Sequence, residues 1–107
     1  MKLIFAVIRD KDANDAVDEL IRRRIGVTKL SSTGGFLRDG NTTLMIGTED
    51  ERVDDCIACI SKCCKQRTEI VPGAASIGLG LESAMPIEVT VGGATVFVTN
   101  VERFEKL

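Results

Sequence analysis

The chain has 107 residues, the length of one compact domain, which leaves no room for a second hydrophobic core. Its composition, 44% hydrophobic and 28% charged residues, is that of a globular protein and excludes a disordered chain. The formal net charge of −2 gives no overall field that would attract nucleic acid or an anionic membrane, so an anionic ligand needs a local site. Histidine is absent, which removes the commonest acid–base group and argues against hydrolytic or metal-dependent catalysis.

The first segment, residues 2–8 (KLIFAVI), is a nearly continuous apolar run. Its length and β-branched residues predict a central strand that is covered on both faces. The run is too short for a secretory signal, and no segment approaches the roughly 20 apolar residues that a transmembrane helix needs. Without an export signal, an oxidising compartment is not implied, and we expect a cytoplasmic protein.

Helices and strands are expected to alternate in the segment that follows. Asp12 is the expected N-cap of a first helix, and Gly26 is its expected end. Residues 27–32 and 41–48 are expected to form strands, and Asp50 is the expected cap of a second helix. The buried stripe of that second helix is expected to consist of Val53, Cys56, Ile57, Ile60, Cys63 and Cys64.

The cysteines are concentrated in this second helix. Cys56, Cys59 and Cys63 fall within roughly 60° of one helical face, with Cys64 beside them. Four ligands along one helix surround a zinc ion poorly, because structural zinc sites take their ligands from separate segments. Buried cysteine also packs as a small hydrophobic residue. Core packing is therefore the favoured interpretation, and a metal or redox role is the alternative.

The C-terminal third begins with residues 67–86, which lack a clear period and are expected to form a long loop. Residues 87–91 and 94–99 are expected to form a β-hairpin with Gly92-Gly93 as its turn. The order of elements predicts an α+β fold, a ferredoxin-like βαββαβ sandwich with an extra hairpin strand. Helices cover only one face of such a sheet, so we expect a symmetric trimer in which the bare faces meet.

The glycine-rich stretch between the second and third expected strands is a candidate nucleotide site. Its consecutive glycines allow backbone N–H groups to cradle phosphate oxygens, and Lys29 and Arg38 could add positive charge. Phe36 and Leu37 could form an apolar wall for a base, and the amide of Asn41 could read a base edge. On these residues alone an ordinary hairpin loop is the commoner alternative.

Four blocks of sequence resemble the cyclic-di-AMP receptors related to the PII signal-transduction proteins. They are MKLIFAVIRDKD, TKLSSTGGFLRDGNTTLMIG, EDERVDD and PIEVTVGGATVFVTNVERFEKL, and together they cover nearly the whole chain in the right order. The resemblance implies a single PII-like domain over residues 1–107, with 34–40 as a short ligand loop and 67–86 as a long mobile loop. It also implies a homotrimer that binds cyclic-di-AMP in signal transduction and has neither catalytic residues nor a cofactor.

The resemblance further implies three ligand sites, each lying between neighbouring subunits. The matching positions on one subunit are Thr28, Gly35, Phe36, Leu37, Asn41 and Gly47. Phe97 of the neighbour would stack on an adenine, an interaction that contributes about 1–3 kcal/mol in comparable sites. Two positions depart from the family pattern: Gly26 stands where many relatives have an arginine, and Asp39 where a small residue is more usual.

Three alternative functions stay open on the sequence. The same trimer could bind ATP or another adenine nucleotide, or it could be a structural trimer without a ligand. An enzyme is the third, although no acid–base or nucleophilic constellation stands out. The expected partners are further copies of the chain, the second messenger and an unidentified downstream protein, and neither nucleic acid nor membrane.

Overall fold

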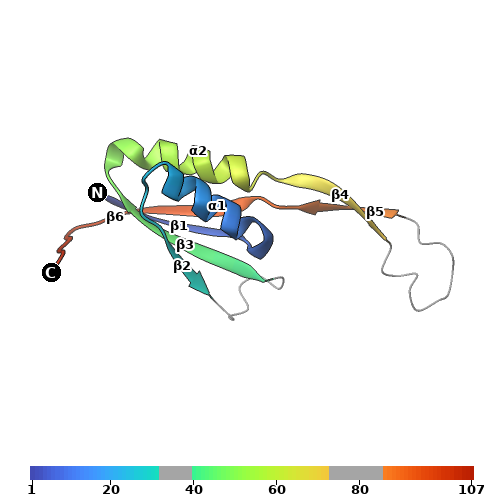
Figure 1. Cartoon of the computed structure of the whole chain (residues 1–107), viewed down its shortest axis with the longest axis horizontal. Coiled ribbons are helices and arrows are strands. Elements are labelled where there is room, and N and C mark those ends of the chain that lie inside the picture. Colours follow the sequence, from blue (N-terminus) through green and yellow to red (C-terminus); the bar gives the residue numbers. More distant parts are fainter. Residues whose placement is uncertain (32–39, 73–85) are drawn as a thin grey trace.

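The protein is an antiparallel sheet with two helices on one face and a two-stranded ribbon at one end (Figure 1). The structure, a computed structural model, describes residues 1–31, 40–72 and 86–107. The elements are β1 (Lys2–Arg9), α1 (Asp10–Arg22), β2 (Thr28–Ser31), β3 (Asn41–Thr48), the 3-10 turn η1 (Asp50–Arg52), α2 (Val53–Cys63), β4 (Arg67–Pro72), β5 (Pro86–Val91) and β6 (Ala94–Asn100). No helix in these described ranges is long and apolar enough to cross a membrane.

The main sheet has the strand order β2-β3-β1-β6, and all of its neighbouring strands are antiparallel. An antiparallel four-stranded sheet with two helices is the α+β arrangement expected from the sequence and is compatible with a ferredoxin-like fold. β1 lies between β3 and β6, which confirms the prediction of a central strand. Ile4, Ala6 and Ile8 of β1 are buried against the helices.

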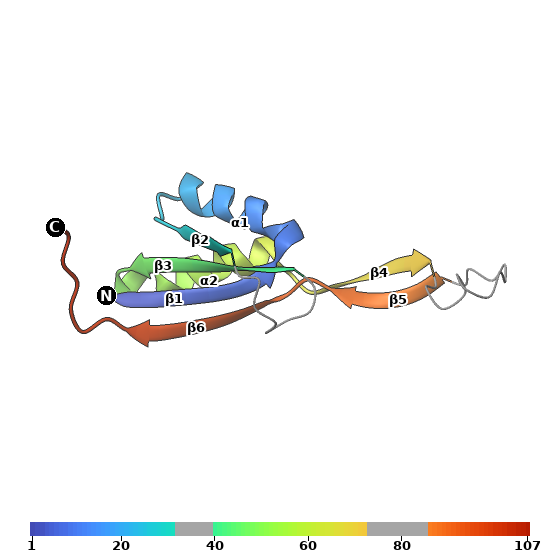
Figure 2. The same cartoon turned by 90° about the horizontal axis from the view of Figure 1, so that it is seen from below.

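The other face of the sheet, which we call the open face, is not covered by any described element of the same chain (Figure 2). Its β1 positions are the alternate residues Leu3, Phe5, Val7 and Arg9, each of them only partly buried. Within one subunit, therefore, β1 is covered on one face, and coverage of its second face by another subunit stays a prediction.

Helix α1 begins at Asp10, two residues before the expected N-cap. Asp12 lies inside the first turn, where it is 5% exposed and forms an ion pair with Arg67 at 3.3 Å. The N-cap prediction was wrong because Asp12 serves a long-range contact, which no local pattern records.

The end of α1 also differs from the prediction. Arg24, with φ of 61°, takes the left-handed position that ends the helix, and Gly26 lies beyond it. The N–H of Ile25 donates to the carbonyl of Leu20 at 2.9 Å, the hydrogen bond that closes a helix end of this type. Gly26 is consequently not required for helix termination.

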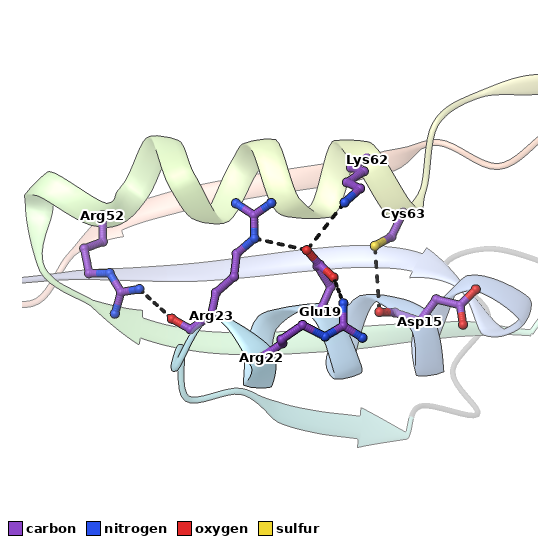
Figure 3. A network of polar contacts seen from close by, with 7 residues as sticks. All are labelled: Asp15, Glu19, Arg22, Arg23, Arg52, Lys62 and Cys63. Atoms are coloured by element: carbon purple, nitrogen blue, oxygen red, sulfur yellow. Dashed lines mark hydrogen bonds and ion pairs between the residues drawn. The ribbon is translucent and has the colours of Figure 1, made fainter.

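A polar network joins α1 to α2 (Figure 3). Glu19 accepts hydrogen bonds from Arg22 and from Arg23, the latter at 3.2 Å, and its carboxylate lies 3.6 Å from the ammonium of Lys62 on α2. The guanidinium of Arg52 donates to the backbone carbonyl of Arg23 at 2.8 Å. These contacts join the C-terminal end of α1 to both ends of the segment formed by η1 and α2.

The cysteines of α2 pack in the core, as the favoured interpretation predicted. Cys56, Cys59 and Cys64 are almost completely buried, and all four cysteines are free thiols. Ile57 was wrongly placed in the buried stripe, because its side chain is 37% exposed. Within the described ranges, no group of three or more acidic or cysteine side chains could hold a metal ion.

The C-terminal third differs most from its prediction. Residues 67–72 form strand β4, which pairs with β5, so the prediction of a loop from residue 67 was wrong there. Residues 73–85 of the expected loop lie outside the described part of the chain, and its last residue, Pro86, begins β5. β6 pairs with β1 and not with β5, so Gly92-Gly93 is not a hairpin turn.

Gly92 and Gly93 instead lead the chain from the ribbon into the main sheet, so that β5 and β6 follow each other end to end (Figure 2). Both glycines have positive φ, 83° and 87°, which side chains of other residues disfavour. A Cβ at Gly92 would lie 2.7 Å from the guanidinium of Arg67 and from the carbonyl oxygen of Lys65. The two glycines are therefore needed at the junction.

Candidate ligand-binding site

Five of the residues proposed from the sequence lie in described elements: Thr28 and Lys29 on β2, Asn41 and Gly47 on β3, and Phe97 on β6. The remaining site residues, Gly35, Phe36, Leu37 and Arg38, and the departing residue Asp39 lie outside the described residues, and so does the short ligand loop except Gly40. The described part of the site therefore consists of residues on β2, β3 and β6.

Four of these five residues share the open face. Asn41 and Gly47 alternate along β3 with residues that are buried against the helices. Thr28 pairs with Met45 of β3, and Phe97 pairs with Phe5 of β1. Directly paired residues of antiparallel strands point to the same face, so all four side-chain positions belong to the uncovered side.

The four residues do not meet at one point within a single subunit. Thr28 and Phe97 end the same cross-strand row and are three strand spacings, about 14 Å, apart. Asn41 and Gly47 begin and nearly end β3 and lie about 20 Å apart. A ligand that contacts both must extend along β3, and Phe97 of the same chain lies two strands away from that line.

Gly47 faces open space within its own subunit. A Cβ added there would have no atom of the described chain within 4 Å, and its φ is not in the left-handed region. Neither packing nor backbone conformation therefore requires glycine. A glycine inside a strand often marks a place where a ligand or another backbone approaches closely, and Gly47 fits that description.

Phe97 is the most exposed large apolar side chain among the described residues of the four-stranded sheet, at 53%. Other apolar residues on the same face are Leu3, Phe5, Val7, Leu30 and Met45. Grouped apolar side chains that remain accessible in a single chain are typical of interaction surfaces. The open face thus combines an apolar centre with the polar positions of Thr28 and Asn41.

Lys29 is separated from the other four residues. It pairs with the buried Leu44, so it belongs to the helix-covered side of β2. Its ammonium lies 3.5 Å from the side-chain oxygen of Asn14 on α1. The sheet therefore lies between Lys29 and the polar positions of the open face.

Arg9 is a cation on the open face that the sequence interpretation missed. It pairs directly with Asn41, at the end of β1 where β3 begins. No ion pair with a carboxylate is present for Arg9 in the described ranges. The signal was available, because Arg9 continues the alternation of Leu3, Phe5 and Val7.

Gly26 precedes β2 and is exposed. A Cβ there would contact nothing within 4 Å, and its φ is not in the left-handed region. The backbone therefore accommodates a larger side chain at this position, including the arginine that the family pattern carries.

Groups with shifted pKa values lie away from the open face in the described part of the chain. The hydrogen bond from Arg23, with Lys62 and Arg22 nearby, lowers the pKa of Glu19 against the opposing effect of burial. Burial raises the pKa of Cys64 to about 12 and raises those of the other three cysteines. These residues belong to the helix layer, so the described open face offers stacking and hydrogen-bonding groups, with no activated acid or nucleophile among them.

Two comparisons place the chain among known proteins. A family model described as cyclic-di-AMP receptor matches residues 1–107. The crystal structure of a functionally unknown protein from Pediococcus pentosaceus ATCC 25745 is similar, with a TM-score of 0.79 and 44% sequence identity. That alignment covers 99% of this chain and 96% of the other. Because the family match spans every residue, this chain belongs to the cyclic-di-AMP receptor family.

Proposed function

We propose that this protein is a cytoplasmic signal-transduction protein that binds cyclic-di-AMP between the subunits of a PII-like homotrimer. Each site takes Thr28, Gly35, Phe36, Leu37, Asn41 and Gly47 from one subunit and Phe97 from its neighbour. We further propose that the glycine-rich loop and the longer loop beyond β4 rearrange when the ligand binds, and that a downstream protein binds the rearranged surface.

The observation that carries this proposal is the common face of Thr28, Asn41, Gly47 and Phe97. These residues lie far apart in the sequence, and the strand register brings them all to the one side of the sheet that the helices leave uncovered. In a trimer that buries its bare sheet faces, residues at the two edges of the sheet lie near a neighbouring subunit. The separation of Phe97 from β3 within one chain favours a site completed by that neighbour.

We add Arg9 to the proposed phosphate contacts in place of Lys29. A guanidinium forms paired hydrogen bonds with phosphate oxygens. Arg9 lies on the same face of the sheet as Asn41 and is its direct partner on the neighbouring strand. Lys29 lies on the helix-covered face. Arg38 keeps its proposed role as a second phosphate-proximal cation.

Mixed trimers test the shared site directly. Phe97→Ala and Asn41→Ala proteins are each expected to bind cyclic-di-AMP weakly as homotrimers. After the two are mixed under conditions that exchange subunits, some interfaces combine the wild-type Asn41 of one chain with the wild-type Phe97 of the other. Recovery of high-affinity sites in the mixture supports the proposal. If trimers form and exchange but no such sites appear, the intersubunit arrangement is wrong.

A further inference from the structure

The first residue of α1 is tied to the segment that follows the glycine-rich stretch. The backbone N–H of Asp10 donates to the carbonyl oxygen of Gly40 at 3.0 Å. The hydroxyl of Thr42 donates to the carboxylate of Asp10 at 2.5 Å. Asp10 therefore holds the residue before Asn41 through its backbone and the residue after Asn41 through its side chain.

Gly40 is shaped to this contact. Its φ of 47° lies in the left-handed region, and a Cβ built there would be 2.5 Å from the carboxylate of Asp10. The backbone conformation therefore favours glycine, and a larger residue would also displace the carboxylate of Asp10 from its present position. Thr42 is 5% exposed and belongs to the helix-covered face of β3.

Asn41 lies between these two held residues and is directed to the opposite side. Because side chains alternate along a strand, fixing Thr42 against α1 turns Asn41 toward the open face. Asp10 therefore lies on the helix-covered side of the sheet, while the amide of Asn41 lies on the open face. Asp10 can therefore fix the orientation of Asn41 without touching the ligand itself.

We propose that Asp10 is a positioning residue for the ligand site and acts by holding Gly40 and Thr42 so that Asn41 is presented to the nucleotide. This inference rests on the proposed function of Asn41 as a ligand-binding residue. A side chain held in place before binding loses less conformational freedom when the ligand arrives, which increases affinity.

The charge of Asp10 makes the test sharp. Removing a carboxylate near an anionic ligand strengthens binding if the residue acts only through its field. Positioning predicts the opposite sign for Asp10→Ala, a loss of about tenfold in affinity for cyclic-di-AMP. Asp10→Asn removes the same charge but keeps an oxygen that accepts the hydrogen bond from Thr42, so its affinity is expected to equal or exceed that of the wild type.

The matched control is Asp18→Ala, which removes an exposed carboxylate from the same helix. Its affinity is expected to stay within about twofold of wild type, because charges at this exposed position are screened by salt. Asp10 is itself exposed and is the first residue of its helix, so its variants are expected to fold. Thr42→Val, which removes only the hydroxyl donor, gives a second test of the same contact.

A double-mutant cycle, measured by calorimetric titration with cyclic-di-AMP, tests whether Asp10 acts through Asn41. Wild type, Asp10→Ala, Asn41→Ala and the double variant are compared, together with Asp10→Asn, Thr42→Val and the control. If Asp10 acts through Asn41, the loss caused by Asp10→Ala disappears when Asn41 is already alanine.

The outcomes distinguish a failure of this proposal from a failure of the proposed function. Wild-type binding with unchanged or tighter binding by Asp10→Ala overturns the positioning role alone. A loss that is fully additive with Asn41→Ala, or one that Asp10→Asn does not restore, overturns it as well. An absence of wild-type binding overturns both proposals together.

Discussion

Phe5 and Phe97 lie directly opposite each other on β1 and β6, and both side chains face the open side of the sheet. The position of Phe97 is consequently set by strand register. A slip of one residue would turn Phe97 toward the helices and expose Val96, which packs against the core. The buried alternation of β1 and the partial burial of Val96 on β6 therefore set the face on which the proposed adenine platform, Phe97, lies.

Replacing Phe97 with alanine is expected to weaken cyclic-di-AMP binding by roughly 10- to 100-fold, which corresponds to the loss of one stacked base. Ile21→Ala is the matched control, because Ile21 is similarly exposed, at 59%, but lies on α1 in the helix layer. Titration of both variants, with sedimentation to confirm the same assembly, checks the prediction. Equal affinity of Phe97→Ala and wild type would remove Phe97 from the site.

Arg9→Gln and Lys29→Gln form a second pair of variants. Both remove one positive charge, but Arg9 is on the open face and Lys29 on the helix-covered face. Arg9→Gln is expected to lower affinity roughly tenfold or more and to reduce its salt dependence, because a charged hydrogen bond to phosphate is lost. Lys29→Gln is expected to bind nearly as the wild type does. The reverse order of effects would show that Lys29, and not Arg9, contacts the phosphates.

Restoring the family arginine at position 26 is expected to increase affinity. Gly26 is exposed, its φ is not left-handed, and a Cβ there has no neighbour within 4 Å, so Gly26→Arg is compatible with the backbone. One added charged hydrogen bond contributes about 1.5–3 kcal/mol, which is a roughly 10- to 100-fold gain. Gly26→Gln, which adds length without charge, is the control. If Gly26→Arg binds no better than Gly26→Gln, the residue does not face the phosphates.

Glu19 predicts a specific dependence of stability on pH. The hydrogen bond from Arg23 and the nearby cations lower the pKa of Glu19 below its ordinary value of 4.5. A lowered folded-state pKa stabilises the protein above the unfolded-state pKa, and this contribution is lost as the pH falls through the folded-state value. Chemical unfolding at fixed protein concentration should therefore show wild type more stable than Glu19→Gln at neutral pH, with the difference shrinking below about pH 4.5.

Asp18→Asn is the control for that experiment, since Asp18 is an exposed acid on the same helix and forms no ion pair in the described part of the chain. Its difference from wild type should change little over the same range. A constant difference between wild type and Glu19→Gln at all pH values would contradict the role of the network.

The cysteines are expected to react with a thiol reagent in a fixed order. Burial raises the pKa of all four, that of Cys64 to about 12, so little thiolate forms at pH 8. Cys63 is the least buried and should react first, and Cys63→Ser should remove that phase. The other three should react only on unfolding. Rapid modification of Cys56, Cys59 or Cys64 in folded protein would favour a redox role over core packing.

Those parts of the fold that follow local periodicity could be predicted from the sequence. The alternation in β1 and β3 and the helical spacing of the α2 cysteines each reflect one buried face. The apolar run of β1 also indicated its central position. These features depend on neighbouring residues, so a single sequence records them.

Features that depend on distant partners could not be predicted in the same way. Gly92-Gly93 has the positive φ values of a hairpin turn, but the same backbone also leads a strand from one sheet into another. Asp12 resembles a cap, yet it pairs with Arg67, and Lys29 resembles a phosphate ligand, yet register turns it toward Asn14. Pairing between strands decides the roles of Gly92-Gly93 and Lys29, and a long-range ion pair decides that of Asp12.

Calorimetric titration of the purified protein tests the central proposal most directly. Cyclic-di-AMP, ATP and cyclic-di-GMP are titrated separately, and their affinities are compared. We predict saturable binding of one cyclic-di-AMP per subunit with a dissociation constant on the order of tens of micromolar or tighter, and weaker binding of the other two. Tighter binding of ATP would assign the site to another adenine nucleotide. No saturable binding of cyclic-di-AMP in that range would contradict the proposed function.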